Sequence, residues 1–220
     1  MNVTLLHQVE DVKPLPANTS RRQKQAAATH QEILAAARHL FATQGYAATS
    51  MSAIAKEAQT AVQTIYDSVG PKHAIILALV DTLEDEAEVD LFRQRIQTTT
   101  VPREAIALFV ALTRGFAERG GDVISILSSA AASEPDIAAA WHKANANHRM
   151  GARFVASIIE RAGALRPDLS LDKAADTIGA LTWGLTWQQL TRGYGWSLDD
   201  CSAWMCDSLY RLLLRDNEAA

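Results

Sequence analysis

The sequence predicts an all-α protein: an N-terminal three-helix bundle with a helix-turn-helix, followed by a larger helical domain. Apolar residues recur at helical spacing through most of the 220 residues, and no segment alternates in the manner of a β-strand. Glycines, prolines and hydroxyl residues divide the chain into segments of helical length. Two short helical segments lie close together near the N-terminus, with the spacing of a helix-turn-helix.

The chain begins with a segment that has no periodicity. Residues 1–20 contain Pro14 and Pro16 and are predicted to form a flexible arm. Helical periodicity is clear over 29–44, where apolar residues form a single stripe. Gly45 follows the last apolar turn and is expected to cap this helix at its C-terminus.

Two short helices are expected next. The first covers 51–58, and either Thr49 or Ser50 can supply the N-capping hydroxyl. The second covers 61–67 and ends before Gly70, which precedes a proline suited to the first turn of a further helix.

The remainder of the chain also follows a helical pattern. Proline, glycine and serine positions separate its segments. The predicted helices cover 72–97, 102–120, 122–132, 133–161, 170–192 and 197–215.

Charge is distributed unevenly along the chain. The net charge of -4 argues against a protein that coats nucleic acid without specificity. Residues 21–80, however, carry six Lys and Arg against three Asp and Glu, while the rest of the chain is acidic. This asymmetry favours phosphate contact by the N-terminal third alone.

The cysteines and the N-terminus indicate a cytoplasmic protein. Cys201 and Cys206 are five residues apart and point in different directions on a helix, so they are interpreted as reduced thiols. Residues 1–20 lack the features of a secretory signal, and no long apolar run predicts a membrane span.

Residues 54–66 carry the most informative pattern, since they include two short helices separated by about three residues. In a helix-turn-helix the second helix enters the major groove of DNA. Thr60, Gln63, Thr64 and Tyr66 can exchange hydrogen bonds with base edges and phosphates. Lys72, at the start of the following helix, is expected to reach a phosphate.

The spaced residues of this region resemble the DNA-binding domain of the tetracycline-repressor (TetR) family. The resemblance covers residues 29–81 and is specific, because many positions agree at once. The matching residues are Ile33, Leu34, Ala36, Ala37, Leu40, Phe41, Gly45, Tyr46, Thr49, Ser50, Ile54, Ala55, Ala58, Thr64, Ile65, Tyr66 and Lys72.

The resemblance implies a sequence-specific transcriptional regulator, a repressor released from a palindromic operator by a small apolar or aromatic effector. After the arm over 1–20, it implies a DNA-binding domain over 21–81 and an effector-binding and dimerisation domain over 82–220. The positions expected to contact DNA are Ser50, Thr60, Val62, Gln63, Thr64, Tyr66, Ser68 and Lys72.

The sequence departs from the family pattern within this region. Gln59 stands where glycine is usual, and a non-glycine residue at positive φ costs about 1 kcal/mol. Ala61 replaces a common serine, which removes a cap from the recognition helix. Asp67 and Ser68 replace an aromatic residue and a histidine that often contact phosphate.

The role of Asp67 stays open between two alternatives. Its carboxylate could accept a hydrogen bond from a cytosine amino group and so exclude other bases. It could instead be a solvated group paired with a nearby basic residue such as Lys56.

The two C-terminal helices are expected to form a homodimer interface, because each has more apolar surface than one subunit core requires. The penultimate helix carries one apolar face on Ile178, Leu181 and Leu185 and another on Trp183, Trp187, Leu190 and Tyr194. The last helix carries a stripe of Cys201, Trp204, Met205, Leu209, Leu212 and Leu213.

Large side chains on several helices of the C-terminal part predict an apolar cavity for a small molecule. Taken singly, each is more typical of an ordinary core residue than of a ligand contact. The candidate effector-binding residues are Phe116, Trp141, His148, Met150, Phe154, Trp183 and Trp187.

Two other functions are considered. An enzyme is disfavoured because the sequence has no phosphate-binding glycine loop, no zinc-protease motif and no nucleophile elbow. Neither a cofactor nor a metal site is predicted. A DNA-binding regulator without a small-molecule effector is the second alternative.

Overall fold

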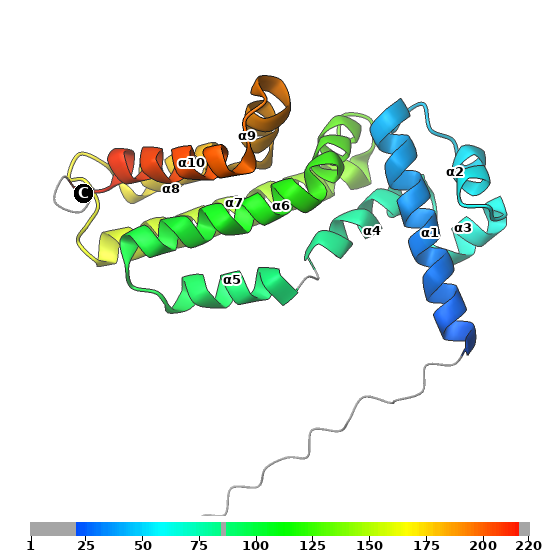
Figure 1. Ribbon diagram of the computed structural model, residues 1–220, viewed down its shortest axis with the longest axis horizontal. Coiled ribbons are helices and arrows are strands. Elements are labelled where there is room, and N and C mark those ends of the chain that lie inside the picture. Colours follow the sequence, from blue (N-terminus) through cyan, green and yellow to red (C-terminus); the bar gives the residue numbers. More distant parts are fainter. Residues whose placement is uncertain (1–20, 85–86, 216–220) are drawn as a thin grey trace, which may run out of the picture.

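The computed structural model describes residues 21–84 and 87–215, so the predicted arm over 1–20 lies outside the described residues. Within these ranges the protein consists of helices with one isolated β-bridge, between Leu165 and Leu214, and the predicted all-α class is confirmed (Figure 1). No helix in the described part of the chain is both long and apolar enough to cross a membrane.

Four helices form the N-terminal end of the molecule (Figure 1). They are α1 (Arg21–Gln44), α2 (Met51–Glu57), α3 (Val62–Ser68) and α4 (Lys72–Glu84). α1 begins eight residues before the predicted start at 29, because the polar and Ala-rich sequence of 21–28 consists of good helix formers. α4 continues past residue 81, so the two predicted domains share this helix.

The larger part is built around two long antiparallel helices, with α5 on one side and α8 and α10 on the other (Figure 1). The elements are α5 (Ala87–Thr98), α6 (Pro102–Ala130), α7 (Pro135–Arg161), α8 (Leu171–Thr182), α9 (Gly184–Gln188), the π-helical turn η1 (Gln189–Gly193) and α10 (Leu198–Leu213).

The glycine pair at 120–121 does not end a helix, contrary to the sequence prediction. α6 runs unbroken from Pro102 to Ala130, with both glycines buried. A Cβ atom on Gly120 would lie 2.3 Å from Cδ1 of Leu83 on α4. The missing side chain at this position therefore lets α4 pack closely against α6, and the glycine serves a helix contact rather than a turn.

The helix predicted over 170–192 is interrupted. Trp183 has extended backbone angles, φ -65° and ψ 143°, which separate α8 from α9. The segment predicted as one helix over 72–97 is also two, α4 and α5, and residues 85–86 lie outside the described part.

The apolar core of the N-terminal end extends into α6 and α7. Ile33, Phe41 and Ile76 of the first four helices belong to the same buried cluster as Val123 on α6 and Ile137 on α7. A second cluster fills the space between α6, α7, α8 and α10. The N-terminal helices therefore do not have a core of their own.

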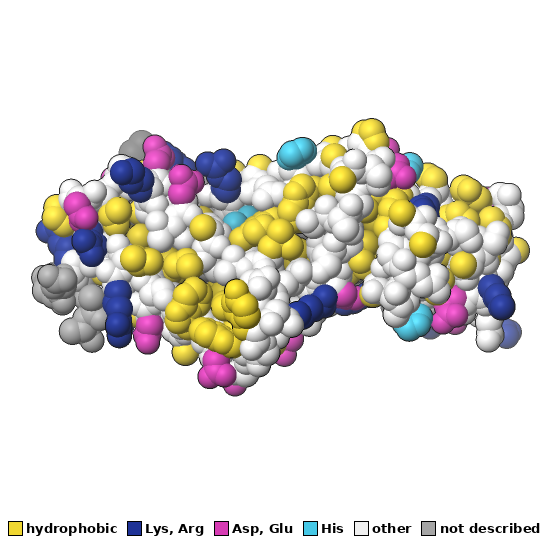
Figure 2. Space-filling model, turned by 90° about the horizontal axis from the view of Figure 1, so that it is seen from above, with side chains coloured by type: hydrophobic (Ala, Val, Ile, Leu, Met, Phe, Trp, Pro, Cys, Tyr) yellow, Lys and Arg dark blue, Asp and Glu magenta, His cyan; other side chains and the backbone are white. Residues whose placement is uncertain are grey.

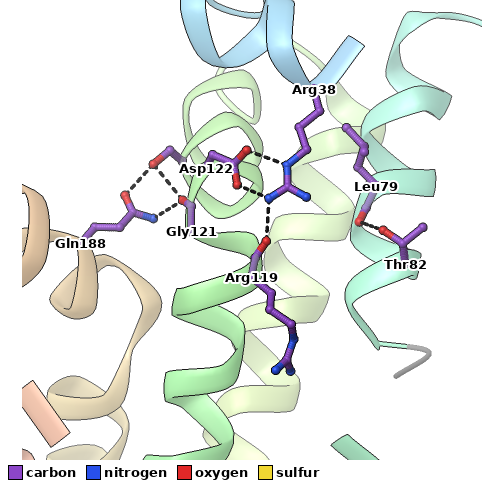
Figure 3. A network of polar contacts seen from close by, with 8 residues as sticks. Arg38, Leu79, Thr82, Arg119, Gly121, Asp122 and Gln188 are labelled. Carbon is purple, nitrogen blue, oxygen red and sulfur yellow. Dashed lines mark hydrogen bonds and ion pairs between the residues drawn. The ribbon is translucent and has the colours of Figure 1, made fainter. Parts of the chain in front are cut away.

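A polar network crosses the junction between the two parts (Figure 3). Arg38 on α1 donates hydrogen bonds to both carboxylate oxygens of Asp122 on α6, at 2.6 Å each, and to the backbone carbonyl of Arg119 at 2.5 Å. Gln188 on α9 donates to the Gly121 carbonyl at 2.8 Å. The network therefore connects α1 to α9 through one turn of α6.

Candidate functional site

Helices α2 and α3 are packed on α1 through a few apolar side chains. Ile54 and Ala55 of α2 and Ile65 of α3 are buried. The Ser50 hydroxyl accepts a hydrogen bond from the Ala53 amide at 3.1 Å and caps α2, so Ser50 and not Thr49 is the cap of the two that the sequence offers. The opposite face of α3 is open to solvent, and Tyr66 keeps 48% of its surface exposed.

The turn between α2 and α3 contains an unusual backbone conformation. Gln59 has φ 50° and is the one non-glycine residue with positive φ in the described part of the chain. The amide of Thr60 donates to the Ala55 carbonyl at 2.9 Å, which closes the turn tightly. Ala61 makes no side-chain cap, so α3 begins without one, in agreement with the sequence.

Asp67 has a partner that neither sequence alternative named. The amide nitrogen Nε2 of Gln63, one turn earlier on α3, donates to Oδ1 of Asp67 at 2.8 Å. Both side chains are exposed. This hydrogen bond orients the amide and the carboxylate together on the surface of the helix.

Lys72 holds the start of α4 against the loop that precedes α2. Its ammonium group donates to the carbonyls of Tyr46 at 3.0 Å and Thr49 at 3.1 Å, and it lies 4.2 Å from the centre of the Tyr46 ring. An ammonium group has three donors. Two of them are used inside the protein, and a phosphate contact of the third stays a prediction.

A cavity of about 420 Å³ lies between α4, α5, α6 and α7 and the break at Trp183. Its size is within the range of about 300–1,000 Å³ that is usual for small-molecule sites. Val80 and Leu83 of α4 form part of its wall. An occupant of the cavity would therefore touch the helix that directly follows α3.

Aromatic rings surround His148 at one wall of this cavity. Its ring centre lies 4.9 Å from that of Trp183 and 5.5 Å from that of Phe109, and Trp141 meets Trp183 edge to face at 5.2 Å. Burial lowers the pKa of His148, although a hydrogen bond to the Gly179 carbonyl opposes the shift. The imidazole is therefore neutral near neutral pH.

Residues 33–79, which include α2 and α3, match the sequence profile of the bacterial regulatory proteins of the tetR family. The chain carries a TetR-family DNA-binding domain. This match confirms the family resemblance seen in the sequence and identifies a DNA-binding transcriptional regulator. The family of this matching segment is one of regulatory proteins. No curated protein matches the chain in sequence.

Solved structures of regulators share the whole fold. NalD of Pseudomonas aeruginosa, a repressor of a multidrug efflux pump, has a TM-score of 0.70 and 19% identity, with 88% of this chain and 99% of that chain covered. The ketosteroid regulator KstR2 of Mycobacterium tuberculosis has a TM-score of 0.69 and 20% identity, with 85% and 95% covered.

A third structure of this fold was solved with a ligand. A regulator from Saccharomonospora viridis in complex with choline has a TM-score of 0.66 and 23% identity. The comparison covers 86% of this chain and 99% of that chain.

Six of the eight residues expected to contact DNA lie on α3 or in the turn before it, whereas Ser50 caps α2 and Lys72 begins α4. Gln63, Tyr66 and Ser50 are exposed, whereas the other predicted positions are partly buried. The partly buried positions are Thr60, Val62, Thr64, Ser68 and Lys72. DNA contact by all eight stays a prediction.

Six of the seven predicted effector-binding residues line the cavity. They are Phe116, Trp141, His148, Met150, Phe154 and Trp183. Trp187 lies outside the lining and is fully buried in the core. Its indole Nε1 donates to the Thr113 hydroxyl at 3.2 Å, and this internal partner explains why an aromatic residue with a polar group is tolerated there.

Sequence reasoning missed other residues that form the site. Phe109 lies against His148 and was indistinguishable from an ordinary core residue in an apolar helix. Val80 and Leu83 also belong to the cavity wall. Arg38 and Asp122 are separated by 84 positions, and no sequence pattern linked them.

The last helix has two apolar sides with different surroundings. Cys201, Met205, Leu209 and Leu213 recur every four residues and are buried in the subunit. The other side exposes Trp204 and Leu212, at 38% and 48%, and the Trp204 ring meets that of Trp196 edge to face at 5.8 Å. Figure 2 shows hydrophobic side chains gathered in patches over the half of the molecule that holds α8 to α10.

Proposed function

We propose that this protein is a repressor that binds a palindromic operator as a homodimer and releases it when a small apolar or aromatic molecule enters the cavity. The observation that carries the proposal is the position of the cavity. Its wall includes Val80 and Leu83 of α4, and Lys72 holds the N-terminal end of the same helix to the loop that precedes α2.

A ligand in this cavity would act on the DNA-binding domain through direct contact. α4 lies against α6 where Gly120 allows close approach, and side chains on both helices face the cavity. A packed interface of this kind shifts between discrete arrangements rather than deforming smoothly. A movement of α4 relative to α6 would change the separation of two recognition helices in a dimer.

The dimer is proposed to form through the exposed side of α10. Trp204 and Leu212 are large apolar groups in contact with solvent in the single subunit, and burial of such groups stabilises association. Two subunits are required because a palindromic operator presents two half-sites about one helical turn of DNA apart.

The solved structures support the ligand part of the proposal by their fold. One of them is described as a repressor of an efflux pump and another was solved with choline. A helical domain of this architecture thus accommodates a small molecule in at least one regulator.

Gel-shift titration with the DNA upstream of its own gene tests the proposal. The protein should retard this DNA, with an affinity that falls steeply as salt increases because phosphate contacts release counterions. Gln63→Ala on α3 should weaken binding, whereas Gln94→Ala, which changes another exposed glutamine, on α5, should leave it unchanged. Equal behaviour of the two variants would show that α3 is not the recognition helix.

Sedimentation of the purified protein tests the dimer. Leu212→Glu should shift the protein to a monomer and weaken operator binding. Leu91→Glu is the matched control, since Leu91 on α5 is exposed to 55% but lies away from α10. A dimer that survives Leu212→Glu would contradict the proposed interface.

A further inference from the structure

The His148 ring is held at the cavity wall by hydrogen bonds through one of its nitrogens. Nε2 lies 3.0 Å from the carbonyl oxygen of Gly179 and 3.4 Å from Oγ1 of Thr182. A carbonyl can only accept, and the Thr182 hydroxyl donates its own hydrogen to the Ile178 carbonyl at 2.7 Å. Both contacts therefore require the ring proton to be on Nε2.

The other nitrogen, Nδ1, is thereby left as an acceptor. The ring is neutral, so Nδ1 carries a lone pair and no proton. Among the described residues, the hydrogen bonds of His148 all involve Nε2 and none involves Nδ1. Every buried polar side-chain atom in the described part of the chain has a hydrogen-bond partner. Since Nδ1 has none, it is not a buried atom. His148 belongs to the lining of the cavity, so we infer that a molecule inside it can donate to this acceptor.

The surroundings of this acceptor favour a flat, uncharged molecule. Trp183 and Phe109 flank the imidazole, and Trp141 lies beside Trp183. Arg93 is the one charged side chain among the described residues of the lining, and it pairs with Asp90 at 3.5 Å. The described lining has no carboxylate to balance a cation.

We propose that the effector is an uncharged aromatic compound with a hydroxyl or N–H group, of which a phenol is the simplest case, and that this group donates a hydrogen bond to Nδ1 of His148. The inference rests on the proposed function, since it names the chemical class of the effector. In this proposal His148 favours molecules that carry a hydrogen-bond donor over molecules of the same shape that lack one.

Calorimetric titration of the full-length protein tests this selection with three compounds of similar shape. Para-phenylphenol has the donor, biphenyl lacks it, and para-methoxybiphenyl carries an ether in its place. The phenol should bind about tenfold more tightly than either of the others, as expected for one hydrogen bond of about 1.4 kcal/mol.

Variants of His148 decide whether the preference arises from its ring. His148→Phe removes the acceptor, and the three compounds should then bind within about twofold of one another. His148→Gln supplies an amide N–H for Gly179 and an oxygen that can accept, so it should keep the preference. Trp141→Phe is the matched control: it should weaken all three compounds alike.

Several results would overturn the inference. They are equal binding of the phenol and biphenyl by the unaltered protein, no binding of any of the three, and tighter binding of benzyltrimethylammonium than of the phenol. The comparison on the unaltered protein decides the question even where a variant fails to fold. A phenol that binds through His148 without releasing DNA in the gel-shift assay would refute effector-controlled release and leave the ligand class intact.

Discussion

Arg38 on α1 and Asp122 on α6 form an ion pair with two parallel hydrogen bonds, which joins the DNA-binding domain directly to the helix that lines the cavity (Figure 3). Burial alone would raise the pKa of Asp122, but the hydrogen bonds and the positive charge of Arg38 outweigh it and hold the pKa below its usual value. The pair is partly exposed to solvent, so its contribution to stability is moderate.

Replacing this carboxylate gives a prediction with a defined pH dependence. Asp122→Asn should lower the free energy of unfolding by about 1 kcal/mol at neutral pH. Because the pKa is depressed in the folded state, the stabilisation is complete above the ordinary carboxyl pKa and disappears as pH falls through the folded value. Urea unfolding of both proteins should show a constant difference above about pH 5 that closes in acid. A difference independent of pH would show that the charge is not involved.

The buried imidazole predicts a change of stability in a higher pH range. Burial, the main cause, lowers the pKa of His148, so the unfolded chain takes up a proton before the folded one. Stability should therefore decrease as pH falls below about 6.5. His148→Gln has no such proton to take up, and its melting temperature should fall less between about pH 7.5 and pH 5. An equal fall of the melting temperature in the two proteins over this pH range would contradict the prediction.

The left-handed residue in the turn predicts a stabilising substitution. Gln59→Gly should raise the free energy of unfolding by about 1 kcal/mol, because glycine adopts a φ of 50° without steric strain. Gln94→Gly, in the middle of α5, should lower it by a similar amount, since glycine is a poor helix former. Urea unfolding measures both, and destabilisation by Gln59→Gly would show that the turn is not strained.

The close contact of α4 and α6 predicts that a methyl group added at Gly120 lowers the stability of the protein. Gly120→Ala places a Cβ atom 2.3 Å from Leu83 Cδ1 in a buried contact, and it should lower stability by about 1–3 kcal/mol. Gly115→Ala on the same helix meets the guanidinium group of Arg119 instead. This control should be tolerated, because a long side chain can move. Thermal unfolding compares the two, and equal melting temperatures would refute the close-approach role of Gly120.

The DNA-binding helices could be predicted from the sequence because their signals are local. The apolar stripe around Ile33 and Phe41 defines the buried side of α1, and the Ser50 cap defines the start of α2. Each depends on residues a few positions apart. The resemblance also marked position 59, where glycine is usual, as a departure that could reshape the turn, whereas Gln59 keeps a positive φ of 50°.

Features that depend on distant partners could not be predicted. A glycine pair in a helical segment resembles a break, and only Leu83, on another helix, shows that Gly120 serves a contact. Trp187 and Trp183 are four residues apart and similar in sequence context. Trp187 lies in the core, where its indole N–H donates to the Thr113 hydroxyl. Trp183 lies at the cavity, where the helix is interrupted after α8.

The extension of the N-terminal core into α6 and α7 has a consequence for protein engineering. A fragment that ends after α4 would leave Ile76, Leu79 and Leu83 without Val123 and Ile137, which belong to the same buried cluster. The DNA-binding unit is therefore not a portable module. A chimaera that transfers its operator preference to another regulator has to carry the second half of α6 and the start of α7 along with the first four helices.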